Sequence, residues 1–159
     1  MDNPESVAEH SLRSAQIGYV LAVLEKYDNP HTVVSAIVFH DIGETRIGDI
    51  HLIAKKYIQA DEESAVRDQL RDLPFLQSEI LDLWKQVEER GTILGNIAKD
   101  ADLLEQAITA KEFAEKGYSR ANTWIDNVEL SLKTKSAQLL LKSLKNSDSL
   151  GWWNGLNSI

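Results

Sequence analysis

A histidine and an aspartate stand side by side as His40 and Asp41, directly after the apolar run at residues 33–39. A short glycine-containing loop follows them, so both side chains should project from the end of a buried element. A neutral imidazole and a carboxylate together suit a divalent transition metal. Such a pair also occurs by chance, and it gains weight because His10 lies upstream and Asp102 lies downstream. The chain thus offers a histidine, a His-Asp pair and an aspartate, in that order, as candidate metal ligands.

Length and composition limit the classes of protein to which the chain can belong. Its 159 residues suffice for one domain with a substantial core. The absence of cysteine excludes disulfides and thiolate ligands, and it is compatible with a cytoplasmic location. The first residues lack the basic and apolar regions of a signal peptide. No apolar stretch approaches the ~20 residues needed to span a bilayer.

The formal net charge of −8 would repel duplex DNA on average, and there is no basic stripe to overcome this repulsion. We therefore expect neither a nucleic acid polymer nor a membrane as a partner. A small phosphate monoester is still compatible with this charge, because a bound metal ion supplies local positive charge.

Helices are expected to position the candidate ligands. Ser6-x-x-Glu9 is a capping-box pattern and predicts the start of a first helix. One face of this helix combines apolar residues with a histidine at helical spacing, namely Val7, His10, Ile17, Leu21 and Leu24. His10 therefore points with the apolar stripe, where a polar ring needs a partner. Taken alone, this pattern favours a core histidine bonded to a backbone carbonyl.

The helical pattern continues along the chain. Asn29 can cap a second helix with Pro30 at its first position, although the β-branched run at residues 33–39 fits a buried strand equally well. Later helices are predicted at residues 61–72, 77–90 and 93–116, with breaks at Pro74 and Gly117. A last long helix is predicted from the spacing of Val128, Leu132, Leu139, Leu140 and Leu144.

Four segments follow one another along the chain: PESVAEHS at residues 4–11, HDIGE at 40–44, GDI at 48–50 and DADLLE at 100–105. Together they resemble the HD-domain metal-dependent phosphohydrolases and, within this family, the 5'-deoxynucleotidase-like branch. The resemblance runs from Pro4 to about Phe113. It implies an all-α fold, a compact HD-domain helical bundle, with residues 1–159 as a single domain and a helix at residues 33–39.

Two departures from the family pattern concern the selection of sugar and base. Family members carry a helix with an arginine before PESVAEHS, whereas this chain begins almost at the motif. Either its start is truncated or the element is lacking. Ile50-His51 stands where the family often has a proline after the GD pair.

The resemblance implies that one divalent ion binds to His10, His40, Asp41 and Asp102. Helical spacing does not choose between Asp100 and Asp102, which flank the apolar stripe on opposite sides at about 100° per residue. The resemblance selects Asp102, and Asp100 is then expected to be a solvated carboxylate. Two neutral imidazoles and two carboxylates balance a divalent charge, and Mn, Fe, Co, Ni and Zn all tolerate such ligands.

The same resemblance implies that Glu44 and Asp49 are catalytic. Glu44 follows Asp41 by three positions and should lie near the ion, where it could orient the attacking water or take its proton. Asp49 follows Gly48, where the backbone bends freely, and it could protonate the leaving alkoxide or bond a sugar hydroxyl. The alternatives are an exposed loop carboxylate for Glu44 and a turn-forming aspartate for Asp49.

Candidate substrate contacts are less specific. Arg13 lies one helical turn after the first candidate ligand, and Lys56 belongs to a Lys-Tyr pair similar to that of the family. Either cation could meet a phosphate. Glu89, in the pair Glu88-Glu89, could reach a nucleoside. The alternatives are surface cations and solvated carboxylates.

The predicted reaction is the release of phosphate from deoxynucleoside monophosphates by a cytoplasmic 5'-deoxynucleotidase. The alternatives are another HD-type phosphomonoesterase or phosphodiesterase, and a metal-binding protein without turnover. Glu44 and Asp49 favour an enzyme. Several family members are dimers, and Trp152 and Trp153 offer apolar area to a partner subunit, so a homodimer is expected. The other interpretation is that both rings cover an edge of the core.

Overall fold

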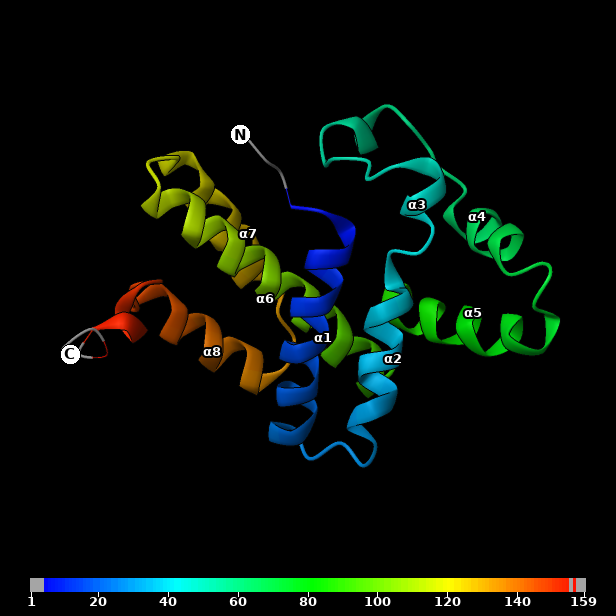
Figure 1. Ribbon diagram of the computed structural model, residues 1–159, viewed down its shortest axis with the longest axis horizontal. Helices are drawn as coiled ribbons and strands as arrows, with labels where there is room; N and C mark the ends of the chain where they lie inside the picture. The colour runs from blue at the N-terminus through cyan, green and yellow to red at the C-terminus, as the bar shows by residue number, and fades with distance from the viewer. Residues whose placement is uncertain (1–4, 155, 157–159) are drawn as a thin grey trace.

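The computed structural model of the protein describes residues 5–154 and 156 (Figure 1). These residues form α-helices and short 3-10 helices and no strand, so the predicted all-α fold is confirmed. The α-helices are α1 (Val7–Leu24), α2 (Pro30–His40), α3 (Glu44–Ile47), α4 (Glu62–Gln69), α5 (Pro74–Glu89), α6 (Ile93–Glu115), α7 (Asn122–Ser131) and α8 (Lys135–Lys145). The 3-10 helices are η1 (Ala54–Lys56), η2 (Ser119–Ala121) and η3 (Gly151–Trp153). Within this described part, none of the helices combines the length and the apolar character that a membrane crossing requires.

The first helix, α1, begins where the capping box predicts it. The Ser6 hydroxyl accepts a hydrogen bond from the Glu9 amide at 3.2 Å, and the Glu9 carboxylate accepts one from the Ser6 amide at 2.9 Å. Each side chain thus satisfies an amide that the helix start would leave unpaired. The start of α1 is therefore determined locally, one turn before His10.

The ambiguous segment at residues 33–39 is helical and forms most of α2. Pro30 occupies the first turn of α2, where its missing N–H loses no hydrogen bond. Val33, Ala36 and Ile37 lie three and four positions apart and are fully buried, because α2 packs against α1, α5 and α6. The packing of this helical face therefore overrides the preference of the β-branched residues for a strand.

The long helix α6 packs against α1, α2, α5, α7 and α8, and Figure 1 shows α5 and α4 on one side of the molecule and α8 on the other. The main core cluster joins α1, α2 and α6. A Cβ built on Gly18 of α1 would overlap the Ile37 side chain, so this glycine allows α1 and α2 to approach closely. Ala98 and Ala101 of α6 are fully buried in the same cluster. Small residues thus bring three helices near enough for their polar side chains to meet.

The C-terminal part corrects the prediction of one last long helix. The helix α7 ends at Ser131, Leu132 is extended, and Thr134 caps α8 by accepting a hydrogen bond from the Ala137 amide at 3.3 Å. The helix predicted at residues 77–90 also begins earlier than expected. Pro74 occupies the first turn of α5, where proline is favoured, and does more than end the preceding helix.

Asp100 is fully buried, so the prediction of a solvated carboxylate is wrong. Its carboxylate accepts hydrogen bonds from the Lys133 amide at 3.0 Å and the Thr134 amide at 2.6 Å. It also accepts one from the Arg90 guanidinium at 2.5 Å. These bonds tie α6 to the break between α7 and α8, where two amides outside any helix need an acceptor.

Trp152 and Trp153 lie in η3 and remain 64% and 51% exposed. Their rings meet edge to face, with 5.2 Å between the centroids. Because more than half of each residue is in solvent, the interpretation that both rings cover an edge of the core is wrong.

Replacing Asp100 by alanine should destabilise the fold, because the Arg90 charge and two backbone amides would lose their acceptor. Removing one member of a buried ion pair costs about 3–5 kcal/mol, and urea denaturation should show a loss of that order in the free energy of unfolding. Asp68→Ala removes an exposed aspartate of α4 and should change this free energy by less than about 0.5 kcal/mol. A D100A protein as stable as the wild type would contradict the structural role.

Candidate metal centre

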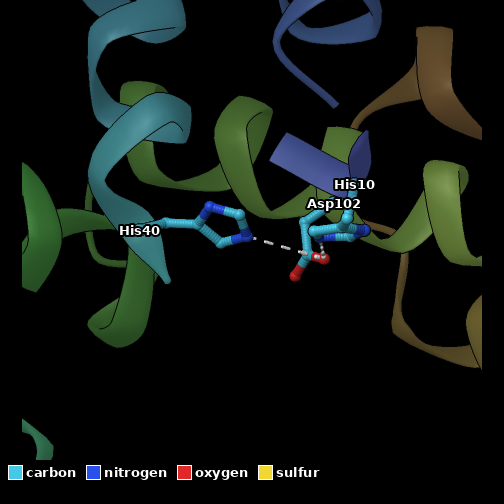
Figure 2. A group of neighbouring side chains, drawn as sticks. All are labelled: His10, His40 and Asp102. Carbon is cyan, nitrogen blue, oxygen red and sulfur yellow. Dashed lines mark ion pairs between the residues drawn. The ribbon is translucent and has the colours of Figure 1, made fainter. Parts of the chain in front are cut away.

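His10 of α1, His40 at the last residue of α2 and Asp102 of α6 converge at one site (Figure 2). One nitrogen or oxygen atom of each residue lies within 4.8 Å of the others. Oδ1 of Asp102 is 3.1 Å from Nε2 of His10 and 3.8 Å from Nε2 of His40. Figure 2 shows the His40 ring pointing toward this carboxylate, with the His10 ring beside it. Residues far apart in the sequence thus present donor atoms to a common point.

Asp41 lies at the same site. Its Oδ2 is 3.1 Å from Nε2 of His40 and 3.6 Å from Nε2 of His10. The residue forms the C-cap of α2, so its side chain follows directly from the end of that helix. The side chains of the cluster range from 1% exposed for His40 to 21% exposed for Asp41. The structure therefore brings all four predicted ligands together, largely shielded from solvent.

Each histidine is held through its Nδ1 atom. Nδ1 of His40 is 2.6 Å from the carbonyl oxygen of Ile37, which can only accept, so this nitrogen carries the proton. Nδ1 of His10 is 2.5 Å from Oε2 of Glu105, a carboxylate that likewise accepts. Both rings therefore turn Nε2 toward the two aspartates. Metal-ligating histidines are commonly oriented in this way, through a hydrogen bond from the other ring nitrogen.

Nε2 of His40 is buried, and among residues 5–154 and 156 no group is oriented to form a hydrogen bond with it. A buried polar atom without a partner is costly. Two imidazole nitrogens and two carboxylates match the ligand chemistry of divalent transition metals. The residues present therefore fit a metal ion.

Lys99 also belongs to the site, although it lies outside the motifs that predicted the ligands. Its Nζ is 2.7 Å from Oδ2 of Asp102, one turn further along α6, which leaves Oδ1 to the histidines. Burial lowers the pKa of Lys99, but the carboxylates of Asp102, Glu88 and Asp41 outweigh burial and raise it. A lysine and an aspartate three positions apart share a helix face, and this spacing is the signal that could have identified Lys99.

The histidines and carboxylates shift one another's pKa values. Burial lowers the pKa of His10, but its contacts with Asp102 and Glu105 outweigh burial and raise this pKa to about 10. Burial raises the pKa of Asp102, yet the two histidines and Lys99 hold it well below its usual range. At neutral pH in the metal-free protein, the His10 ring therefore carries a second proton, on Nε2, in addition to the one on Nδ1. A metal ion would have to displace the proton on Nε2.

Glu44 is the first residue of α3 and follows Asp41, the candidate ligand at the end of α2, by three residues in the sequence. Its amide donates to the Asp41 carbonyl at 3.0 Å, which closes a turn between the two residues. Partial burial, together with the charges of Asp41 and Asp49, raises the pKa of the Glu44 carboxyl to about 7. A carboxyl group with this pKa can exchange protons near neutral pH. Asp49 is exposed after Gly48, whose φ is +80°, and its charge acts on Glu44.

Arg13 was predicted to meet a phosphate, but protein side chains hold its guanidinium. Nε donates to Oε1 of Glu105 at 2.7 Å, and Nη1 donates to Oε1 of Glu112 at 2.9 Å. Nη2 contacts Glu105 and Thr109 and lies 3.6 Å from Glu5. The phosphate role of Arg13 therefore finds no support in this arrangement. The acidic side chains around it already have a cation, so they are poor candidates for a second metal ion.

The other predicted substrate contacts lie at the surface. Lys56 is exposed at the end of η1. The charge that acts on the Glu44 carboxylate of α3 belongs to the neighbouring Lys55. Glu88 and Glu89 are both exposed at the end of α5, and it is Glu88 whose charge acts on Lys99. The charges that reach the site thus come from residues adjacent to the predicted Lys56 and Glu89.

Comparison with known sequences places the chain among HD-domain proteins. The HD domain family model matches residues 1–144. The 5'-deoxynucleotidase HDDC2 of Xenopus laevis is 31% identical over 121 residues, which cover 72% of this chain and 58% of that protein. The protein of the same name from Dictyostelium discoideum is 28% identical over 129 residues, which cover 75% and 68%. The chain thus spans little more than half the length of the Xenopus relative.

Solved structures have the same fold. A conserved hypothetical protein from Pyrococcus furiosus superposes with a TM-score of 0.78 at 28% identity, over 92% of this chain and 86% of that one. A predicted metal-dependent phosphohydrolase from Magnetospirillum magnetotacticum gives a TM-score of 0.61 at 22% identity, over 91% and 78%, and supports the fold alone. Because the family model covers most of the sequence, this chain belongs to the HD domain family, which its sequence motifs resemble.

Proposed function

We propose that this protein hydrolyses phosphate esters with one divalent metal ion held by His10, His40, Asp41 and Asp102. The observation that carries the proposal is the Nε2 atom of His40, which is buried beside a second imidazole nitrogen and two carboxylates and forms no hydrogen bond with any of the residues that the structure describes. When bound, such an ion lowers the pKa of water and polarises a phosphoryl group. Mn, Fe, Co, Ni and Zn all accept this mixture of nitrogen and oxygen ligands.

Glu44 is proposed to take the proton of the attacking water. The residue lies next to the ligands without belonging to them, and burial and nearby carboxylates raise its pKa to about 7. A base with that pKa is available in its charged form at neutral pH. Asp49 is proposed to protonate the leaving alkoxide or to bond a sugar hydroxyl, since its exposed side chain is near enough for its charge to act on Glu44.

The proposed substrate is a deoxynucleoside monophosphate. The support comes from two relatives named 5'-deoxynucleotidase, at 31% and 28% identity. Phosphate binding in a chain of net charge −8 would depend mainly on the ion, with help from the exposed Lys55, whose charge acts on Glu44. Another phosphomonoester or a phosphodiester is the alternative substrate. A screen for phosphate release over nucleotides with several added metals separates these cases, and no release from any nucleotide would favour a metal-binding protein without turnover.

The homodimer and the cytoplasmic location stay predictions. Exposed apolar residues on the described surface, among them Val20 and Val23 of α1 and Trp152 of η3, support contact with a second copy. Light scattering at micromolar concentration would give the mass in solution.

His40→Ala should remove most of the bound metal, because it deletes the buried nitrogen that we place against the ion. Elemental analysis of the purified proteins measures this directly. His51→Ala changes an exposed histidine outside the cluster and should leave the metal content of the wild type intact. A fully metallated H40A protein would overturn the ligand assignment.

Glu44→Gln should retain the metal but lose about 10²–10⁴-fold in turnover, the usual contribution of a general acid or base. The measurement is phosphate release from a panel of deoxynucleoside monophosphates, with metal content determined on the same samples. Glu79→Gln, at an exposed position of α5, serves as the control and should behave as the wild type. Unchanged turnover in E44Q would show that Glu44 is a spectator.

Metal affinity should increase as the pH rises through the neutral range. The pKa of His10 is about 10 in the metal-free protein, so an ion competes with a proton at every pH below that value. The Kd should fall by about tenfold per pH unit for each proton displaced. Calorimetric titrations in buffers of different ionisation enthalpy should detect the released protons. A Kd that does not vary with pH would contradict the proton competition.

A further inference from the structure

Glu105 is a buried carboxylate of α6 that is not among the predicted site residues, and it is only 1% exposed. Its Oε2 accepts a hydrogen bond from Nδ1 of His10 at 2.5 Å. Its Oε1 accepts hydrogen bonds from Nε of Arg13 at 2.7 Å and from the Thr109 hydroxyl at 3.0 Å. Both oxygens are therefore occupied by α1 and by the next turn of α6, and the carboxylate has little freedom to move.

Where α1 meets α6, each helix contributes two polar residues that are three positions apart. On α1, His10 and Arg13 are one turn apart, and on α6, Asp102 and Glu105 are one turn apart. His10 meets Asp102 through Nε2 at 3.1 Å and Glu105 through Nδ1 at 2.5 Å. One helix thus supplies a candidate ligand together with the residue that orients a ligand on the other helix.

The bond to Glu105 decides which nitrogen of His10 is available. A carboxylate accepts, so Nδ1 carries the proton and Nε2 is left to face the aspartates. The carbonyl of Ile37 does the same for His40, but without a charge. A charged acceptor also makes the ring a stronger base and a stronger ligand. Glu105 therefore acts on both the orientation of His10 and its electron density.

We propose that Glu105 is a positioning residue of the metal centre, which fixes His10 with Nε2 toward the ion and strengthens its binding. The inference rests on the metal site proposed above. The competing explanation is that Glu105 only forms a buried ion pair with Arg13 that ties α1 to α6. That role would affect the stability of the fold and leave metal affinity and the tautomer of His10 unchanged.

Titration of the protein with Co²⁺ at several pH values, followed by its visible absorption, gives the affinity corrected for the proton that competes at His10. Glu105→Gln keeps the shape of the side chain and an oxygen that can accept from Nδ1, but it loses the charge, and its Kd should rise by about tenfold. Glu105→Ala removes the acceptor as well and should raise the Kd by about 100-fold. The matched control is Glu112→Gln, because Glu112 binds Arg13 at 2.9 Å without contacting His10; its Kd should equal that of the wild type.

A second measurement needs no variant. Nitrogen-15 NMR of the Zn²⁺-loaded wild-type protein reports which nitrogen of each imidazole carries the proton, and we expect a protonated Nδ1 on His10. A proton on Nε2 would overturn the inference, as would wild-type Co²⁺ affinity in both Glu105 variants or an equal loss in E112Q. These results differ from a failure of the proposed function, in which the wild-type protein itself would bind no metal at His10 and His40.

Discussion

Two imidazole rings and two carboxylates meet where α1, α2 and α6 pack together. Because these polar side chains are largely buried, each needs a hydrogen-bond or ion-pair partner from the protein. A buried charge or polar group costs several kcal/mol unless protein contacts replace the lost water. Glu105 holds the first histidine, and the backbone carbonyl of Ile37 holds the second. Lys99 holds the far oxygen of Asp102. These partners lie on the same helices as the candidate ligands, so the helix packing and the geometry of the site depend on each other.

The cations near the site are largely engaged by the protein itself. Arg13 is bound to Glu105 and Glu112, and Lys99 is bound to Asp102. In a chain of net charge −8, a phosphorylated substrate would meet little free positive charge from side chains. The proposed metal ion would therefore supply most of the positive charge that a phosphate needs. An acidic composition and a phosphate ester substrate are compatible for this reason.

Sequence patterns predicted the features that depend on neighbouring residues. The capping box at Ser6 located the start of α1, and short ordered motifs identified side chains that the structure brings together. The burial of Asp100 and the break between α7 and α8 were missed, because Asp100 meets Lys133 across 33 residues of sequence. The contact of Arg13 with Glu105 spans 92 residues. Contacts between distant helices leave no periodic signal, so they could be found only in the packed structure.

A single divalent ion between α1, α2 and α6 is the feature on which the proposed chemistry depends. Anomalous scattering from crystals of the full chain saturated with Mn²⁺ would locate such an ion directly. We expect one strong peak at bonding distance from both Nε2 atoms and from Asp41 and Asp102, with Nδ1 of His10 still bonded to Glu105. A peak elsewhere, or no peak at this cluster in saturated crystals, would contradict the metal centre.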